Sequence, residues 1–319
     1  MRETGSRLPQ RLGALATQAL IAEASLSPKP GLVTPLSKGA HADMDYRLFL
    51  SSALALEPCF QACGRAGERA GLQADALAHT GGRRLLERLR VIGKEGERAM
   101  FRATGGVNTH KGAIFCLGLL CTALAFVRSR KSNPGNDGHL GDAACEWVAG
   151  LCSGLVEREL SSALCREPVT AGERLFRDYG VRGARGQAQD GYPLLKSRIL
   201  PGLRVGLDPS SDGFAHACLD ALTLSMSELE DSCLLSRGGA AGLEFVRSGA
   251  TWVQKAGSTK CESGRKALQE LDAALCARGL SPGGSADMLA GGIFLALAER
   301  HFKSSQAPGM YASSIEQIA

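Results

Sequence analysis

A histidine and two carboxylates lie within five residues of one another near the amino-terminal end. His41, Asp43 and Asp45 follow the turn Pro28–Gly31, in which two prolines and a glycine restrict the backbone. Capping of the next helix explains one carboxylate. The histidine and the second carboxylate are more than capping needs, so binding of Mg²⁺ or of a substrate stays open beside the capping interpretation.

A second polar group lies between two predicted helices, in the segment 97–112, which reads ERAMFRATGGVNTHKG. The first helix carries Glu97 and stops at the glycine pair, and the next begins at Asn108, Thr109, His110 and Lys111. Free N–H groups at a helix start bind anions, and the last two of these side chains add donors. We expect an anion site here, while a capped core helix remains the simpler alternative.

Three further glycine-rich segments contain single charged residues. The first is 183–193 (GARGQAQDGYP) with Arg185, the second is SRGG with Arg237, and the third is SPGGSADM with Ser285 and Asp287. Arginine can hold a phosphate through two hydrogen bonds. A carboxylate in the first turn of an apolar helix complements the helix dipole or binds a metal, because burying it alone is costly. The five segments together favour an enzyme that acts on a phosphate-rich nucleotide with Mg²⁺.

The elements that position these residues are predicted to be helices, because alternating runs of β-branched residues are scarce. We therefore expect an all-α fold, a single compact multi-helix domain over residues 1–319 with a core of about 14–302 and buried central helices. Polar or glycine-rich connections are predicted at 129–141, 180–213 and 256–264, and the long second one is expected to cover a site. The predicted helices are Leu8–Leu26, Tyr46–Ala66, Arg83–Ala103, Asn108–Val127, Asp142–Val156, Phe214–Met226, Gly264–Ala277 and Ser285–Phe302.

Composition excludes several classes of function. The net charge is only +5 and aromatic residues make up 5%, which argues against nucleic-acid binding. The apolar run Gly112–Val127 is shorter than the roughly 20 residues of a membrane span, so we expect a buried helix and no membrane. Eleven cysteines without a CxxC motif indicate buried thiols in a reducing cytoplasm. The 40 glycines are expected mainly where backbone approaches phosphates.

The same segments resemble a known family. PKPGLV with GAHADMD, MFRATGGVNTHKGAIFCLGLL, TAGERLFRDYGVRGARGQAQDGYP, SRGG and SPGGSADML occur in this order. They are similar to the signature blocks of the triphosphoribosyl-dephospho-CoA synthase family, which serves citrate lyase and malonate decarboxylase. The resemblance runs from about Ala14 to Leu297, and the arginine-glycine block and the MFRAT lead-in are more like the citrate lyase branch.

The resemblance implies an all-helical transferase that uses a divalent cation, Mg²⁺. It would join ATP to 3′-dephospho-CoA, releasing adenine and forming 2′-(5″-triphosphoribosyl)-3′-dephospho-CoA. A separate transferase then attaches this prosthetic-group precursor to the acyl carrier subunit of citrate lyase. The same reaction serving malonate decarboxylase, and a catalytically silent nucleotide-binding helical protein, remain as alternatives.

The chemistry implied is glycosyl transfer through an oxocarbenium-like state, which calls for a carboxylate near the cationic carbon and a base on the attacking hydroxyl. We expect Asp43, Glu97 and Asp287 to hold Mg²⁺ and triphosphate, with Asp43 also close to the reaction. His110 or Glu23 is expected to accept the proton. Residues expected to bind substrate or phosphate are Lys29, His41, Asn108, Thr109, Lys111, Arg185, Arg237 and Ser285.

The chain departs from the family pattern at four positions. Thr34 stands where the family has an acid, and Gln187 and Gln189 stand where it often has Glu. Cys233 lies in the family's Thr-Asn position after an Asp. A change from Glu to Gln removes a charge, so a shifted substrate choice or a lower activity is the expectation that these positions raise.

Overall fold

The computed structural model describes residues 7–73, 81–130, 139–207 and 213–304. No strand forms in these ranges, and the only β-type pairing described is a single bridge between Thr34 and Ser37. The predicted all-α fold is confirmed. The helices are α1 (Leu8–Ser25), α2 (Tyr46–Leu72), α3 (Gly81–Ala103), α4 (Lys111–Ser129), α5 (Leu140–Leu151), α6 (Leu155–Glu159), α7 (Ala171–Tyr179), α8 (Gly183–Gln189), α9 (Leu200–Gly206), α10 (Phe214–Glu228), α11 (Ser232–Lys255), α12 (Glu262–Arg278) and α13 (Gly283–Ser304), with the 3₁₀ turns η3 (Ser161–Leu164) and η5 (Ser258–Lys260) and the π-helical turn η4 (Leu195–Ile199).

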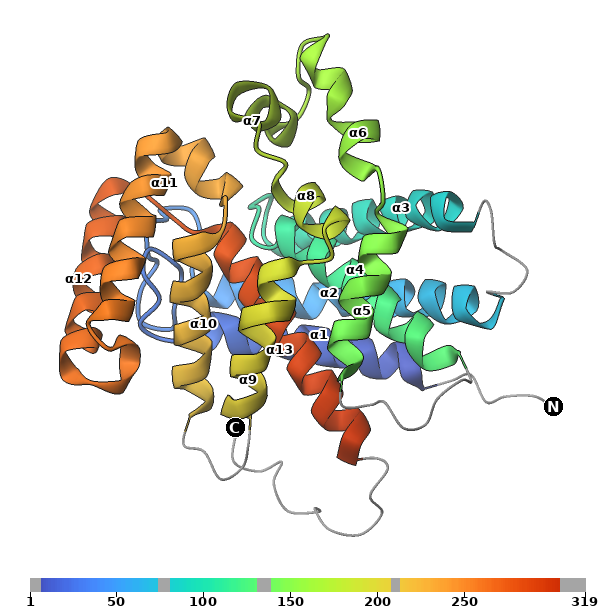
Figure 1. The fold of residues 1–319 in the computed structure, drawn as a ribbon, viewed down its shortest axis with the longest axis horizontal. Coiled ribbons are helices and arrows are strands. Elements are labelled where there is room, and N and C mark those ends of the chain that lie inside the picture. The colour runs from blue at the N-terminus through green and yellow to red at the C-terminus, as the bar shows by residue number, and fades with distance from the viewer. Residues whose placement is uncertain (1–6, 74–80, 131–138, 208–212, 305–319) are drawn as a thin grey trace.

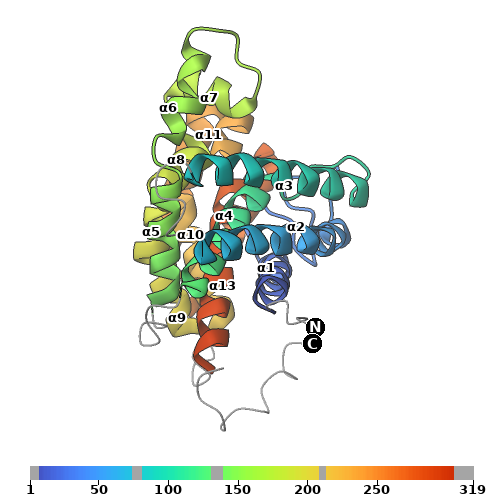
Figure 2. The same cartoon turned by 90° about the vertical axis from the view of Figure 1, so that its right-hand side faces the viewer.

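Helices α4 and α13 form the centre of the fold (Figures 1 and 2). Helix α4 contacts α1, α2, α3, α5 and α13, and α13 also contacts α1, α5, α9 and α10. By length and composition α4 could cross a membrane, with a mean hydropathy of 1.8, but 67% of it is buried inside the fold. Its apolar side chains therefore belong to the core, as predicted for 112–127.

Glycines let these central helices approach closely. A methyl group at Gly67 of α2 would stand 2.0 Å from the carbonyl oxygen of Thr122 in α4. One at Gly291 of α13 would stand 3.1 Å from Cys116 Sγ on the other side of α4. Larger side chains would push the helices apart and open the core. Part of the glycine surplus thus serves helix packing, which differs from its expected role beside phosphates.

The prediction of a loop at 180–213 is wrong over most of that segment. Its described part contains α8, η4 and α9. The leucines and isoleucine at 195, 199, 200 and 203 are almost completely buried, and their spacing gives these short helices an apolar face. Frequent glycine and proline concealed that spacing. Residues 208–212 lie outside the described residues, as do 131–138 of the predicted loop 129–141.

Other differences also arise at glycines. The predicted helix Asp142–Val156 is divided into α5 and α6, because Gly154 adopts a left-handed conformation with φ 67°. Helix α11 was not predicted, because its glycine pair at 238–239 resembles the start of a helix. In the structure, α11 is helical both before and after a break at Gly239.

Helix α7 was also missed, although Thr170 and Glu173 form a capping box at its start. The segment 256–264 contains the short turn η5, in which Thr259 is buried.

Candidate active site

The starts of four helices meet at one cavity of about 170 Å³. Its walls come from the end of α1, from the chain before α2 and the first turn of that helix, from the residues that begin α4, from the first part of α11, and from the start of α13. Helix starts carry partial positive charge, so their meeting favours an anionic ligand. Predicted residues that line the cavity are Glu23, His41, Asn108, Thr109, His110, Lys111, Arg237 and Asp287.

Asp231 joins the starts of α11 and α13. Its Oδ1 accepts the N–H groups of Cys233 at 2.9 Å and Leu234 at 3.4 Å. Its Oδ2 accepts the N–H of Ser285 at 2.8 Å and the hydroxyl of the same residue at 3.0 Å. Burial raises the pKa of Asp231, and these hydrogen bonds oppose the rise. Sequence reasoning did not select Asp231 as a site residue, although an Asp before a helical run is a capping signal.

This arrangement changes the expected role of Ser285. Its side chain is fully buried and is bonded to Asp231, and it does not line the cavity. Ser285 therefore helps to set the direction in which α13 starts, two residues before Asp287. It positions the site, which differs from the predicted phosphate contact.

Arg237 and His41 form one wall of the cavity. Arg237 donates to His41 Nδ1 at 3.2 Å, and His41 Nε2 lies 2.8 Å from Ser281 Oγ. Burial and the nearby guanidinium lower the pKa of His41, against the opposing effect of Asp43. Helix α11 breaks two residues after Arg237, where Gly239 has φ 62°, a conformation that other residues rarely adopt. The first turns of α11 therefore end just after Arg237.

Glu23 and Lys29 form an ion pair beside the cavity. Lys29 Nζ lies 2.6 Å from Glu23 Oε1 and donates to the carbonyl oxygen of the same residue at 2.8 Å. The lysine side chain is 2% exposed and does not line the cavity. Lys29 was predicted to bind phosphate, but its ammonium group is already bonded to Glu23. It holds that carboxylate in place at the end of α1.

His110 and Asp287 face the same cavity from α4 and α13. Burial, assisted by the positive charge of Lys29, lowers the pKa of His110 to about 3. Burial and the negative charges of Asp231 and Glu23 raise the pKa of Asp287 well above its ordinary value. A methyl group at Gly112 would stand 1.9 Å from Asp287 Oδ2. The carboxylate therefore lies against the first turn of α4, where only glycine leaves room for it.

The predicted metal set of Asp43, Glu97 and Asp287 is not assembled. Asp43 is 65% exposed, 3.9 Å from His41, and Glu97 pairs with Lys111 at 3.1 Å. Among the described residues, no three His, Cys, Asp or Glu side chains form a group that could hold a metal ion. Asp287 alone of the three lines the cavity. Mg²⁺ often binds through one or two carboxylates and substrate phosphates, and the negative charges around Asp287 fit that mode.

The capping alternatives are partly confirmed. Asp45 caps α2 by accepting the N–H of Leu48 at 3.0 Å. Asn108 accepts the N–H of Lys111, the first residue of α4, at 3.2 Å. Because Asn108 also lines the cavity, capping and a place in the site are compatible there.

The third predicted segment does not reach the cavity. Arg185 in α8 donates to Glu159 at 2.7 Å and is absent from the cavity walls. Three of the positions that depart from the family pattern, Thr34, Gln187 and Gln189, are absent from the walls as well. Cys233 lines the cavity, and burial raises the pKa of its thiol. Of the four positions that depart from the family pattern, Cys233 alone therefore lies in the cavity wall.

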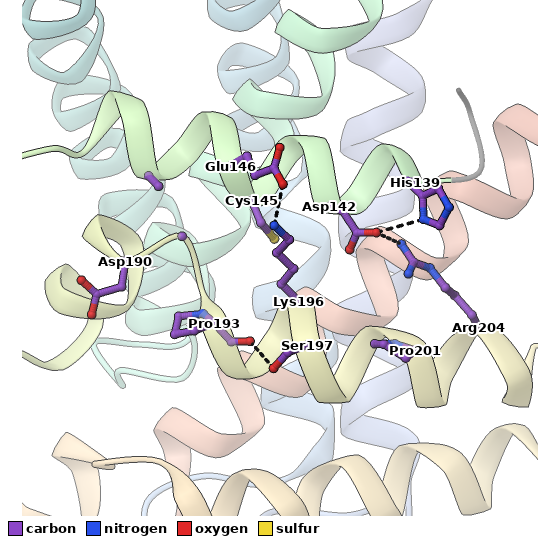
Figure 3. Close-up of a pocket in the computed structure, with 12 residues that line it drawn as sticks. His139, Asp142, Cys145, Glu146, Asp190, Pro193, Lys196, Ser197, Pro201 and Arg204 are labelled. Atoms are coloured by element: carbon purple, nitrogen blue, oxygen red, sulfur yellow. Dashed lines mark hydrogen bonds and ion pairs between the residues drawn. The ribbon is translucent and has the colours of Figure 1, made fainter. Parts of the chain in front are cut away.

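A larger hollow, of about 590 Å³, lies along α5, η4 and α9 (Figure 3). Several of its charged side chains are paired with one another: Lys196 with Glu146 at 2.6 Å, and Asp142 with His139 at 3.1 Å and Arg204 at 3.0 Å. None of the predicted site residues lines it. We therefore assign the chemistry to the smaller cavity.

Comparison with known proteins identifies the family. Residues 9–306 match the ATP:dephospho-CoA triphosphoribosyl transferase family. Relatives from Vibrio cholerae and Pseudomonas syringae pv. tomato, each named probable 2-(5″-triphosphoribosyl)-3′-dephosphocoenzyme-A synthase, are 41% and 42% identical. The matches cover 90% of this chain in both cases, and 88% and 91% of the relatives. No solved structure gives a significant match. The chain belongs to the ATP:dephospho-CoA triphosphoribosyl transferase family.

Proposed function

We propose that this protein joins ATP to 3′-dephospho-CoA, giving 2′-(5″-triphosphoribosyl)-3′-dephospho-CoA and adenine. The observation that carries the proposal is the cavity at which four helix starts, two cationic side chains and two carboxylates meet. A polyphosphate suits the helix starts, Lys111 and Arg237. The carboxylates of Glu23 and Asp287 suit a sugar carbon that becomes cationic.

The reaction exchanges one bond at C1′ of the ATP ribose for another. The bond from C1′ to the adenine nitrogen breaks and its electron pair leaves with adenine, while the 2′-hydroxyl oxygen of dephospho-CoA bonds to C1′. The hydroxyl proton balances the charge on the departing adenine. Glu23, held by Lys29, is our candidate for receiving that proton first. Asp287 is positioned to favour the positive charge at C1′.

Mg²⁺ is part of this proposal. When bound, it would neutralise negative charge on the triphosphate. Asp287 is the protein ligand that we propose, with substrate phosphates supplying further oxygens. Asp43 and Glu97, for the reasons of exposure and pairing given above, are not proposed as ligands.

We propose the acyl carrier subunit of citrate lyase as the final destination of the product, through a separate transferase. The arginine-glycine block and the MFRAT lead-in support this branch over malonate decarboxylase. A cytoplasmic location is also proposed. All eleven cysteines lie in the described part of the chain and are free thiols, which supports a reducing compartment.

The test is incubation of the purified protein with ATP, MgCl₂ and dephospho-CoA, followed by chromatography for free adenine and mass measurement of the nucleotide product. We expect one adenine for each triphosphoribosyl product. Asp287→Asn and His110→Ala are expected to lower the rate at least tenfold. Arg185→Ala is the matched control, since it removes a cationic side chain outside the cavity, and it should keep the wild-type rate.

Two results would contradict the proposal. If no adenine appears with Mg²⁺, Mn²⁺ or Ca²⁺ while ATP still binds, the protein is a nucleotide-binding relative without the activity. If adenine forms at the wild-type rate in both cavity variants, the reaction occurs elsewhere on the molecule.

A further inference from the structure

The two ring nitrogens of His110 have different surroundings. Nδ1 lies 2.7 Å from the hydroxyl oxygen of Ser52 in α2. Nε2 is buried and has no hydrogen-bond partner among the described residues, although His110 lines the cavity. The ring of Phe49 packs against the imidazole in a T-shaped contact, with 4.8 Å between the two ring centroids. Nε2 is thus the atom of this imidazole that is left for a ligand.

The hydroxyl of Ser52 determines which nitrogen carries the proton. Ser52 is fully buried and accepts a hydrogen bond from Thr109 Oγ1 at 2.7 Å. Its own hydrogen then needs an acceptor, and Nδ1 of His110 is the one within reach. If Nδ1 carried the proton instead, the Ser52 hydrogen would be buried without a partner, at a cost of about 1–3 kcal/mol.

We propose that Ser52, oriented by Thr109, is a positioning residue that keeps His110 in the Nε2–H tautomer, so that His110 acts on the substrate as a neutral hydrogen-bond donor. The chain of donors then runs from Thr109 to Ser52 to His110, a residue that lines the cavity, and ends at its Nε2. The two hydroxyls come from the start of α4 and from α2, so the contact between these helices sets the tautomer.

This role separates His110 from proton transfer. A proton acceptor at Nε2 needs a free lone pair there, and the Nε2–H tautomer has none. Burial and Lys29 also keep the ring uncharged. Of the two proton acceptors expected from the sequence, Glu23 therefore remains. If the proposed function holds, an acceptor atom of the substrate, such as a ring nitrogen of the departing purine, would receive this hydrogen bond.

The direct test is nuclear magnetic resonance on the wild-type protein labelled with ¹⁵N-histidine, without substrates. We expect one histidine with a pyrrole-type Nε2 and a pyridine-type Nδ1, unchanged between pH 5 and 8 and missing in His110→Gln. A protonated Nδ1, or a doubly protonated ring at pH 6, would overturn the proposal. Because no substrate is present, this result is independent of whether the proposed function is correct.

Kinetics of adenine release give the second test. Gln can donate from a position similar to Nε2 but cannot accept a proton, so His110→Gln should keep at least ten times the kcat of His110→Ala. Equal losses in the two variants would favour proton transfer and contradict the proposal.

Variants at Ser52 test the positioning role. Ser52→Ala should lower kcat about tenfold or more, leave KM for ATP within twofold, and remove the fixed ¹⁵N pattern of His110. The control is Ser225→Ala, which also removes a fully buried helical serine hydroxyl, bonded there to the carbonyl of Ala221 in its own helix, and should keep the wild-type kcat. A Ser52→Ala variant with wild-type kcat and an unchanged ¹⁵N pattern would refute the role.

Discussion

Replacement of Lys29 by Met should destabilise the protein strongly. The side chains of Lys29 and Glu23 are 2% and 4% exposed, and their charged atoms are 2.6 Å apart. Without the ammonium group, the carboxylate of Glu23 stays in the interior without its partner. Breaking a buried ion pair from one side costs about 3–5 kcal/mol. Since 1.4 kcal/mol corresponds to a factor of ten, the unfolding constant should rise by about 140- to 3,700-fold.

Urea unfolding followed by circular dichroism measures this loss. With a slope of about 3 kcal/mol per molar urea, the midpoint should fall by about 1–1.7 M. Lys111→Met is the control, because its pair with Glu97 is partly exposed, and its cost should stay below about 1 kcal/mol. The double variant Glu23→Gln/Lys29→Met should recover much of the stability but not adenine release. A Lys29→Met midpoint equal to that of Lys111→Met would refute the reasoning.

Three further predictions concern the cavity and one distant helix cap. Gly112→Ala should lower adenine release at least tenfold, because the added methyl group displaces the Asp287 carboxylate, while the free energy of unfolding stays within about 1 kcal/mol of wild type. The control is Gly118→Ala in the same helix, where the added methyl group would lie 3.4 Å from Cys63 Sγ, and this variant should stay active. Asp287→Asn should raise the free energy of unfolding by about 0.5–2 kcal/mol and abolish activity, and a lower urea midpoint would contradict this. Hydrogen bonds from Arg166 and from backbone N–H groups lower the pKa of Glu173 to about 2 from an ordinary 4.5. The ionised Glu173 carboxylate should therefore stabilise the folded protein above pH 4.5, and this contribution should disappear as the pH falls toward 2. The urea midpoints of wild type and Glu173→Gln should accordingly differ at pH 7 and converge in acid.

The all-α fold and most long helices could be predicted, because their apolar residues recur at helical spacing. The ends of helices were predicted less accurately at glycines, because a glycine pair can either end a helix or interrupt one that continues. Gly105 and Gly106 end α3 with positive φ, as expected. The pair at 238–239, of the same composition, interrupts a helix that continues to Lys255. Tertiary contacts around α11 decide the difference, and the local sequence does not contain them.

The residues that line the cavity could be predicted better than the role that each of them has there. Lys29 and Ser285 belong to its support, because a buried ammonium or hydroxyl bonds to the nearest acceptor, and that acceptor depends on the fold. Asp231 and Ser52 were missed, since each resembles an ordinary cap or core residue until its partner from another helix is known. The metal set was predicted from residue type alone, and Glu97 is instead paired with Lys111.

The central place of α4 has a consequence for synthesis on the ribosome. Helices α1, α2 and α3 precede α4 in the chain and can cover one side of it early. Helix α13, which covers another side, ends 175 residues after the end of α4 (304 − 129). At a synthesis rate of about 5–20 residues per second, the side of α4 that α13 covers stays without α13 for roughly 9–35 s. Substitutions on the face of α13 that meets α4 should therefore reduce the yield of folded protein in cells more than the stability of purified protein indicates.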